Sequence, residues 1–271
     1  MKVFPCAKIN LGLYVVERRS DGYHNLETVF YPIPLRDELE ATEADSDELH
    51  IEGLPVFGPV SDNLVMRALN QLRRAGYDIP PLSIRLTKNI PSGAGLGGGS
   101  SDAAFMMLLA REMFHLPVSD QELRQLLAPL GADCPFFVSH QPVFATGIGD
   151  QFTPINLRLT GSWLLLVKPD DFVSTREAYQ GVTPCRPQHD LLQSIQRPID
   201  EWQQIIENDF ENSVFPQHPT IADIKHRLLA SGAVYAAMSG SGSAVYGIFE
   251  QEPSPAVLRQ FDKHFVFLSQ L

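Results

Sequence analysis

The chain has 271 residues, of which 44% are hydrophobic and 20% are charged, as in an ordinary globular protein. This length suffices for one large domain or two moderate ones, each with its own core. The net charge of -11 argues against nucleic acid or an anionic membrane as a partner, because both are bound through clustered Lys and Arg.

The cysteines and the apolar runs indicate the compartment. Three widely spaced cysteines form neither a disulfide framework nor a zinc pattern. The N-terminus lacks the uninterrupted apolar core of a signal peptide, and an apolar run such as 163–167 is far too short to span a bilayer. We therefore expect a soluble cytoplasmic protein.

The first third of the chain mixes strands with helices. Val3 to Glu17 is predicted to be a long strand. The Ser-Asp-Asn triplet at 61–63 is typical of the cap of a helix, which Gly76 then ends. Leu82 to Leu86 alternates apolar and polar residues, as a half-buried strand does.

The most informative stretch follows that strand and reads PSGAGLGGGSSDAA from 91 to 104. Its glycines let successive backbone N–H groups converge on one anion, and the following helix adds its positive dipole end. That helix is predicted because Met106, Leu109 and Met113 recur at helical spacing. The expected phosphate-binding residues are Pro91, Ser92, Gly93, Ala94, Gly95, Leu96, Gly97, Gly98, Gly99, Ser100 and Ser101.

Other interpretations of this loop fit its context less well. Gly93, Gly95 and Gly98 satisfy G-x-G-x-x-G, but a dinucleotide-binding unit needs a second strand soon after the helix. Instead, Ser119 and Glu122 form a capping box that begins another helix. No Lys-Ser/Thr pair follows the glycines, which excludes a P-loop, and a flexible linker would not continue into a packed helix.

The rest of the chain alternates strands and helices without regular βαβ spacing, which favours an α+β fold. Pro129 interrupts the helical pattern, and Phe136 to Ala145 is predicted to be a strand. A second half begins near Gly161 with a buried strand at 162–168. Further helices are expected at 201–207, at 220–230 and from Pro253, with two strands around a glycine-serine loop at 239–243 and a last strand near Phe265.

Three motifs in this order resemble those of the GHMP kinase superfamily, which includes galactokinase, homoserine kinase and mevalonate kinase. They are PCAKINL at 5–11, the glycine loop at 91–104 and SGSGS at 239–243. Two further motifs, RSDGYH at 19–24 and LGADCPFF at 130–137, are similar to those of one branch. That branch phosphorylates the 2-hydroxyl of a cytidine diphosphate-linked methylerythritol in non-mevalonate isoprenoid biosynthesis.

The resemblance implies a two-domain fold with the active site in the cleft between the domains. Residues 1–158 would form a ribosomal protein S5 domain 2-like N-terminal domain, and residues 159–271 a ferredoxin-like C-terminal domain. ATP and Mg²⁺ would be required, and the partner would be a small-molecule substrate. The sequence leaves the oligomeric state open.

The resemblance makes Lys8, Asp133 and Asn10 the catalytic candidates. On pattern alone Lys8 is equally well an exposed strand lysine, whereas in the family its ammonium stabilises charge on the transferred phosphoryl group. Asp133 lies in a turn, where Asp commonly accepts backbone amides, but the family implies a general base. Asn10 would hold the acceptor hydroxyl. Asp102 is expected to be structural, as an acid that complements the helix dipole.

Aromatic residues are the candidates for the acceptor's base. If the acceptor carries cytidine, Tyr23 stacks on the ring and His24 offers a donor and an acceptor to its edge. Tyr179 matches the family position of a second aromatic best, although Phe172 competes and a core role for Tyr179 stays open. The family places a second anion-binding nest at Ser239, Gly240 and Ser241.

Two further positions concern the nucleotide and its metal. Lys88 and Asn89, just before the glycine loop, are expected to line the adenine pocket. Ser101 is the expected protein contact of Mg²⁺.

Two rival functions remain. Another GHMP enzyme, such as homoserine kinase or a mevalonate-pathway enzyme, shares the glycine loop but gives Tyr23 and His24 no role. A catalytically silent nucleotide-binding or sensing protein on the same fold would not need Lys8 and Asp133.

Overall fold

The computed structural model describes residues 1–56 and 58–271, without the side chain of Ser61, which the expected cap includes. Two compact units are interleaved along the chain. Unit 1 comprises 1–8, 34–92 and 97–141, and unit 2 comprises 9–33, 93–96 and 142–271. These two units differ from the two expected domains, which would meet at a single boundary after residue 158. That domain boundary stays a prediction.

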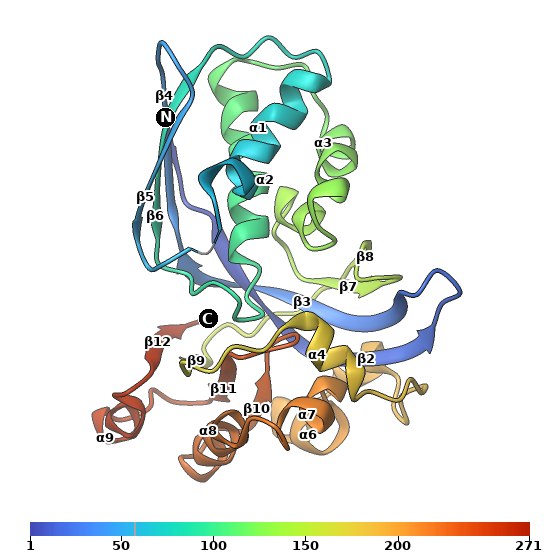
Figure 1. The fold of residues 1–271 in the computed structure, drawn as a ribbon. Helices are drawn as coiled ribbons and strands as arrows, with labels where there is room; N and C mark the ends of the chain where they lie inside the picture. Colours follow the sequence, from blue (N-terminus) through green and yellow to red (C-terminus); the bar gives the residue numbers. More distant parts are fainter. Residues whose placement is uncertain (57) are drawn as a thin grey trace. The chain divides into compact units, whose positions relative to one another are not determined.

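Unit 1 is a four-stranded sheet with helices on one face (Figure 1). The strand order is β1 (Lys2–Val3), β4 (Glu38–Glu43), β6 (Leu82–Lys88) and β5 (Glu48–Gly53). Only the pair of β5 and β6 is parallel. The helices are α1 (Leu64–Arg74), α2 (Gly98–Met113) and α3 (Asp120–Leu127). Buried and less buried residues alternate along β6, as its sequence predicts.

The ends of these helices follow their sequence signals. The Asn63 carboxamide oxygen accepts the N–H of Val65 at 2.9 Å, and Gly76 has φ of 95° just after α1. The Ser119 hydroxyl accepts the N–H of Glu122 at 3.2 Å. Local capping chemistry therefore sets where α1 and α3 begin.

Unit 2 contains an antiparallel sheet in the order β10 (Tyr235–Met238), β11 (Val245–Phe249), β9 (Trp163–Lys168) and β12 (Phe265–Gln270). Along the chain, β9, α8 (Pro219–Ala230), β10, β11, α9 (Pro255–Leu258) and β12 follow the β-α-β-β-α-β pattern of a ferredoxin-like fold, as expected. Four further helices lie between β9 and α8: α4 (Thr175–Gln180), α5 (Leu191–Ser194), α6 (Ile199–Ile205) and α7 (Asp209–Val214).

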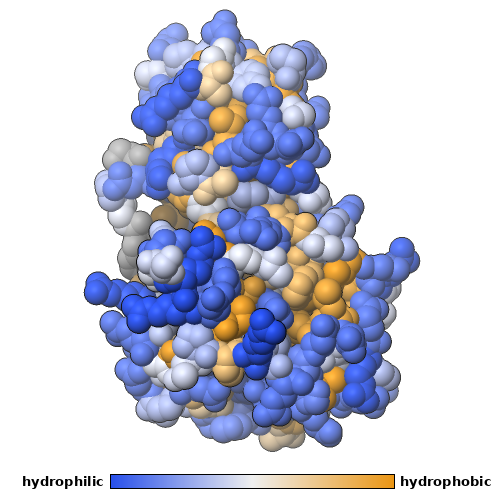
Figure 2. Space-filling view, turned by 90° about the vertical axis from the view of Figure 1, so that its right-hand side faces the viewer, coloured by the Kyte–Doolittle hydropathy of each residue, from blue (hydrophilic) through white to orange (hydrophobic). Residues whose placement is uncertain are grey.

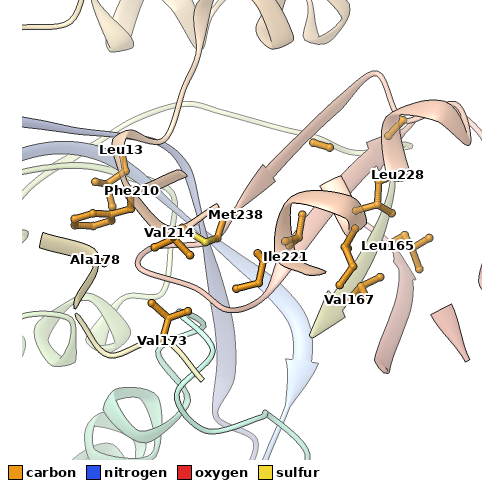
Figure 3. Packing of buried hydrophobic residues seen from close by; sticks show 14 of the residues in the cluster. Leu13, Leu165, Val167, Val173, Ala178, Phe210, Val214, Ile221, Leu228 and Met238 are labelled. Atoms are coloured by element: carbon orange, nitrogen blue, oxygen red, sulfur yellow. The ribbon is translucent and has the colours of Figure 1, made fainter. Parts of the chain in front are cut away.

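A second sheet has the order β2 (Cys6–Arg18), β3 (His24–Arg36), β7 (Val143–Thr146) and β8 (Gln151–Pro154). The core of unit 2 joins this sheet to the ferredoxin-like layer. Figure 3 shows Leu13 from β2 close to Phe210 and Val214 from α7, with Met238 from β10 nearby. A polar residue buried in this apolar core needs a hydrogen-bond partner.

Two predicted strands are wrong in extent. The expected strand at 136–145 begins instead as a 3₁₀ helix, Cys134–Val138, and only β7 is extended. Pro135 in the first turn favours a helical start, and all five residues are buried against α2 and α3, so an apolar run was mistaken for a strand. The expected strand from Val3 is divided into β1 and β2 at Phe4 and Pro5, because proline has no N–H for the ladder.

The surface is mostly polar where it can be seen. Figure 2 shows one face on which hydrophilic residues predominate and hydrophobic residues occupy smaller areas. Among the described residues, no helix is both long enough and apolar enough to cross a membrane.

Candidate active site

Lys8 and Asp133 meet in unit 1. Lys8, on β2, is 3% exposed, and its Nζ lies 3.3 Å from Oδ2 of Asp133. Asp133 precedes the 3₁₀ helix at 134–138, but its side chain makes no capping hydrogen bond there. A third of this side chain is exposed. The carboxylate therefore pairs with a buried ammonium rather than with turn amides, and it is accessible to a reactant.

The first turn of α2 lies against this pair. Gly97 has φ of 70°, and a Cβ at this position would lie 2.9 Å from the Phe137 ring and 3.3 Å from Cε of Lys8. The N–H of Ser101 donates to the carbonyl of Gly97 at 2.8 Å. In an α-helix the amides before that point have no partner within the helix, so they and the dipole can bind an anion beside Lys8.

The tip of the glycine loop, 93–96, belongs to unit 2. There the Ser239 hydroxyl donates to the carbonyl of Gly95 at 2.9 Å, and the N–H of Ala244 donates to the carbonyl of Ala94 at 3.2 Å. Gly95 has φ of 75°, and any Cβ on it would overlap the carbonyl oxygen of Ser239. The two glycine-rich loops are thus bound to each other, which no sequence pattern indicated.

Asn10 follows Lys8 by two residues on β2 and is buried in unit 2. Its N–H donates to the Ser239 hydroxyl at 3.3 Å, and its carbonyl accepts the Tyr246 hydroxyl at 2.6 Å. Its side-chain Nδ2 donates to Oγ1 of Thr28 at 2.9 Å. The backbone and the carboxamide of Asn10 are therefore both held in place.

Asn208 is a residue that sequence reasoning missed. Its Nδ2 donates to the carbonyls of Met238 and Gly240 at 2.8 and 2.9 Å, and its Oδ1 accepts the N–H of Phe210 at 3.0 Å. It therefore fixes the start of the glycine-serine loop, 239–243. The only local signal was its position as a cap of α7, which says nothing of the loop.

The aromatic candidates also lie in unit 2. Tyr23 is 61% exposed on a turn in which its N–H donates to Asp21 Oδ1 at 3.1 Å. His24 stacks on Tyr179, with ring centroids 4.8 Å apart and planes 19° apart, and Tyr179 meets Phe210 edge-on. Burial lowers the pKa of His24 below its ordinary value. The ring is therefore neutral at pH 7 and has one donor and one acceptor.

Phe172 occupies a different place from Tyr179. Its ring is 62% exposed, and a Cβ on Gly93 would lie 3.0 Å from it. Of the two competing aromatics, Tyr179 is the one in contact with His24. The Ser241 hydroxyl lies 3.4 Å from the hydroxyl of Thr175 at the start of α4, the helix that carries Tyr179.

Lys88 is engaged in a buried charge cluster of unit 1. Its Nζ binds a carboxylate oxygen of Asp37 and lies 2.6 Å from Oδ2 of Asp102. Burial alone would lower the pKa of Lys88, but Asp102 and Asp37 outweigh it and raise that pKa. Burial raises the pKa of Asp102 to about 7, although Lys88 opposes the shift. Asp102 pairs with Lys88, whereas the sequence suggested only the helix dipole as its partner.

Asp37 connects this cluster to the glycine loop. Its Oδ1 accepts the N–H groups of Asn89 and Ile90 at 2.6 and 2.8 Å, so the strand end and the loop entry are fixed together. The side chain of Asn89 donates to the carbonyl of Arg36 at 3.0 Å. Asp37 lies between Arg36 and Glu38, and no local pattern singled it out.

A pocket of about 210 Å³ in unit 1 includes Lys88 in its lining. Apolar side chains such as Ile51, Leu64 and Leu86 form much of it, together with Ser92 and Gly99 of the glycine loop. Its apolar walls next to that loop suit a flat base whose phosphates reach the start of α2.

Within the described residues, no group of three or more His, Cys, Asp or Glu could hold a metal ion. The Ser101 hydroxyl is buried in α2 and has no hydrogen-bond partner among the described atoms. An unpartnered oxygen near a helix start that can bind an anion fits a metal that is bound chiefly by phosphate oxygens and water.

A buried lysine paired with an accessible carboxylate at a glycine-rich helix start is an arrangement that suits phosphoryl transfer. The chain matches two family descriptions, GHMP kinases N terminal domain over 63–141 and GHMP kinases C terminal over 190–266. It is 51% identical to the 4-diphosphocytidyl-2-C-methyl-D-erythritol kinase of Bacteroides fragilis, over 100% of both chains. A solved 4-(cytidine 5'-diphospho)-2C-methyl-D-erythritol kinase is 32% identical, with a TM-score of 0.80 and coverage of 99% and 98%.

The mevalonate kinase of Methanococcus jannaschii has the same fold, with a TM-score of 0.69 over 99% and 96% of the two chains, but only 15% identity. The chain belongs to the GHMP kinases and, among them, to the family of 4-diphosphocytidyl-2-C-methyl-D-erythritol kinases. It is therefore a small-molecule kinase, and the rival interpretations are not favoured.

Proposed function

We propose that this protein transfers the γ-phosphoryl group of ATP to the 2-hydroxyl of 4-diphosphocytidyl-2-C-methyl-D-erythritol, a step of isoprenoid precursor synthesis. The observation that carries the proposal is the buried Lys8 ammonium 3.3 Å from the Asp133 carboxylate, against the start of α2. Family membership supplies the identity of the acceptor.

Asp133 takes the proton of the attacking hydroxyl as general base. Lys8 stabilises the negative charge that spreads over the transferring group, because a fixed ammonium in a dry site acts without reorganisation. Asn10, two residues further along β2, holds the polyol end of the acceptor.

ATP is bound by the glycine loop. The residues are Pro91, Ser92, Gly93, Ala94, Gly95, Leu96, Gly97, Gly98, Gly99, Ser100 and Ser101. The amides between Pro91 and Ser101 and the helix start suit phosphate groups, whereas proline has no N–H and the N–H of Ser101 donates to the Gly97 carbonyl. The pocket at Lys88 takes the base, with Lys88 acting through its backbone and stem because its ammonium is engaged by Asp37 and Asp102. Mg²⁺ held by the phosphates and Ser101 would neutralise phosphate charge.

The acceptor is recognised at both ends. Tyr23 stacks on the cytosine ring, and neutral His24, held by Tyr179, hydrogen-bonds its edge. Gly240 and Ser241 bind the diphosphate through their amides. Ser239 does not contribute its amide, because its N–H donates to the carbonyl of Ala244 at 2.8 Å. The protein works in the cytoplasm.

The test is an acceptor panel. The purified protein is incubated with ATP, Mg²⁺ and one acceptor at a time, and ADP release is followed. Turnover is expected with the cytidine diphosphate-linked acceptor and not with homoserine, galactose or mevalonate. Equal rates across the panel, or none with the cytidine acceptor, would contradict the proposal.

A further inference from the structure

A histidine in unit 2 lies between two carboxylates. His218 directly precedes α8, and Nε2 of its ring lies 2.8 Å from Oε1 of Glu177 on α4. The other ring nitrogen, Nδ1, lies 3.5 Å from Oδ1 of Asp171. The hydrogen bond from His218 holds the pKa of Glu177 below its ordinary value, so this carboxylate is ionised at pH 7. Because the partner of one ring nitrogen fixes how the other is directed, Asp171 orients Nε2 toward Glu177.

The backbone on both sides of this contact is fixed. The N–H of His218 donates to the carbonyl of Val214 at 2.9 Å, and its carbonyl accepts the N–H of Ile221 at 3.0 Å. The carbonyl of Asp171 accepts the Ser243 hydroxyl at 2.6 Å. His218 is therefore held between α7 and α8, and the carboxylate that orients it is held by the end of the glycine-serine loop.

The helix that His218 binds is short and carries a candidate substrate residue. α4 has six residues, and an isolated helix of this length is not stable in water. The Ser174 hydroxyl caps its start by accepting the N–H of Glu177 at 3.1 Å, while the Glu177 carboxylate reaches His218. Tyr179 follows two residues later and stacks on His24. The direction of the Tyr179 ring therefore depends on how α4 is held.

The second half of α4 is bound to α7. There the ring of Tyr179 meets Phe210 edge-on. The carbonyl of Ala178 accepts the Ser213 hydroxyl at 2.7 Å. Both contacts lie within two consecutive residues, so a further contact elsewhere on α4 is needed to stop the helix from rotating about its axis.

The first half of α4 supplies this further contact. Its hydroxyl contact, from Thr175 to Ser241, is long at 3.4 Å and exposed. The contact of Glu177 with His218 is shorter and involves an ionised carboxylate, and hydrogen bonds to ionised groups are the stronger ones. The bond to His218 is therefore the main polar restraint on the first half of the helix.

We infer that His218 is a positioning residue that, through Glu177 and α4, fixes the Tyr179 ring against His24. The inference rests on the proposed function, in which His24 hydrogen-bonds the edge of the cytosine ring. His218 acts only through these residues, by setting the direction in which the nitrogens of His24 point. It therefore affects the affinity for the cytidine end of the acceptor and not the rate of phosphoryl transfer.

The test compares His218→Leu, which removes both ring nitrogens, with His218→Gln, whose amide nitrogen can take the place of Nε2. In His218→Leu we expect the Kd for the cytidine acceptor to rise by about 3- to 10-fold, the effect of one misdirected hydrogen bond. His218→Gln should recover most of the lost affinity. The single-turnover rate at saturating acceptor and the Kd for ATP should stay within about twofold of wild type, because neither depends on His24.

The matched control is His226→Leu, the same change at an exposed histidine of α8, which should keep wild-type affinity. If His218→Leu does not fold, Glu177→Ala replaces it and should give the same rise in Kd. Glu177→Ala breaks the same contact from its more exposed side and keeps the backbone N–H that Ser174 caps. An unchanged Kd in either variant would overturn the inference.

A double-mutant cycle separates the positioning of Tyr179 from a general structural role. In a Tyr179→Ala background, His218→Leu should cause no further loss of acceptor affinity. A further loss comparable to that in the wild-type background would overturn the inference, because His218 would then act by a route that does not include Tyr179.

A spectroscopic measurement does not depend on turnover. The ring C–H signals of His24, identified by their loss in His24→Gln, are displaced by the ring current of the stacked Tyr179. They should move in ¹H–¹³C spectra of His218→Leu and stay in place in His218→Gln and His226→Leu. Unmoved signals in His218→Leu would overturn the inference. Wild-type protein that neither binds nor phosphorylates the cytidine acceptor would instead contradict the proposed function, while the His24 signals would still decide whether His218 positions Tyr179.

Discussion

Replacing each of two buried lysines by methionine separates chemistry from folding. Lys8 and Lys88 are both 3% exposed, both lie on strands, and both pair with Asp. Their partners differ. Asp133 is one-third exposed, whereas Asp37 and Asp102 have side-chain exposures of 0% and 3%. The same substitution should therefore have opposite consequences at the two positions.

In Lys8→Met, solvent can hydrate the carboxylate that is left, so the free energy of unfolding should change by about 1 kcal/mol or less. The rate of the chemical step should fall by about 10²-fold or more, the scale of a lost charge-stabilising group. In Lys88→Met, two carboxylates stay buried without an ammonium. Breaking a buried pair costs about 3–5 kcal/mol, which for a chain of this size lowers Tm by about 6–10 °C.

The assays are single-turnover phosphoryl transfer and thermal unfolding on the same preparations. At a temperature where Lys88→Met is still folded, its single-turnover rate should exceed that of Lys8→Met by at least tenfold. A Lys88→Met variant as stable as the wild type would refute the argument from burial. A Lys8→Met variant with wild-type chemistry would remove Lys8 from the reaction.

Further predictions concern Asp133, Tyr23, the glycine loop and the buried Asp102. Asp133→Asn should lower the single-turnover rate by about 10²-fold with little change in acceptor affinity; near-normal chemistry would mean that this carboxylate is not the base. Tyr23→Ala should weaken cytidine binding by about 0.5–1.5 kcal/mol in calorimetric titration, with a smaller effect on the chemical step. Gly95→Val should weaken ATP binding, because its side chain overlaps the Ser239 carbonyl and displaces the loop; unchanged affinity in a folded variant would make the loop a mere connector. The pKa of Asp102 rises from 3.8 in the unfolded chain to about 7 when folded, so between these values the folded state holds more protons and stability falls as pH rises. Urea unfolding from pH 4 to pH 8 should show this decline, and Asp102→Asn should flatten it.

Much of the local structure could be predicted from the sequence. The glycine loop and the caps of α1 and α3 follow from residues within a few positions of one another, because capping and positive φ are local requirements. β9 could be predicted from its local sequence, because it is a short apolar run bounded by turn residues. The family motifs added the expected catalytic roles of Lys8 and Asp133, which the residue pattern alone left undecided.

Elements that depend on packing between distant segments were harder to predict from the sequence. The apolar run at 134–138 is equally compatible with a strand and with a buried turn of helix, and contact with α2 and α3 decides for the helix. Asn208 carries only the signature of a helix cap, although its carboxamide fixes a loop 30 residues away. Such roles depend on contacts between distant segments, which no local pattern encodes.

By itself the sequence determined that a glycine-rich loop joins a strand to a helix, and which kinase family the motifs resemble, because each rests on short-range sequence patterns. The tertiary structure decided which charged and polar groups face one another. Lys8 and Lys88 look alike in the sequence, yet one meets a carboxylate that solvent can reach and the other meets two that it cannot. The energetic role of a buried charge is set by the hydration and charge of its partners, and these exist only in the folded chain.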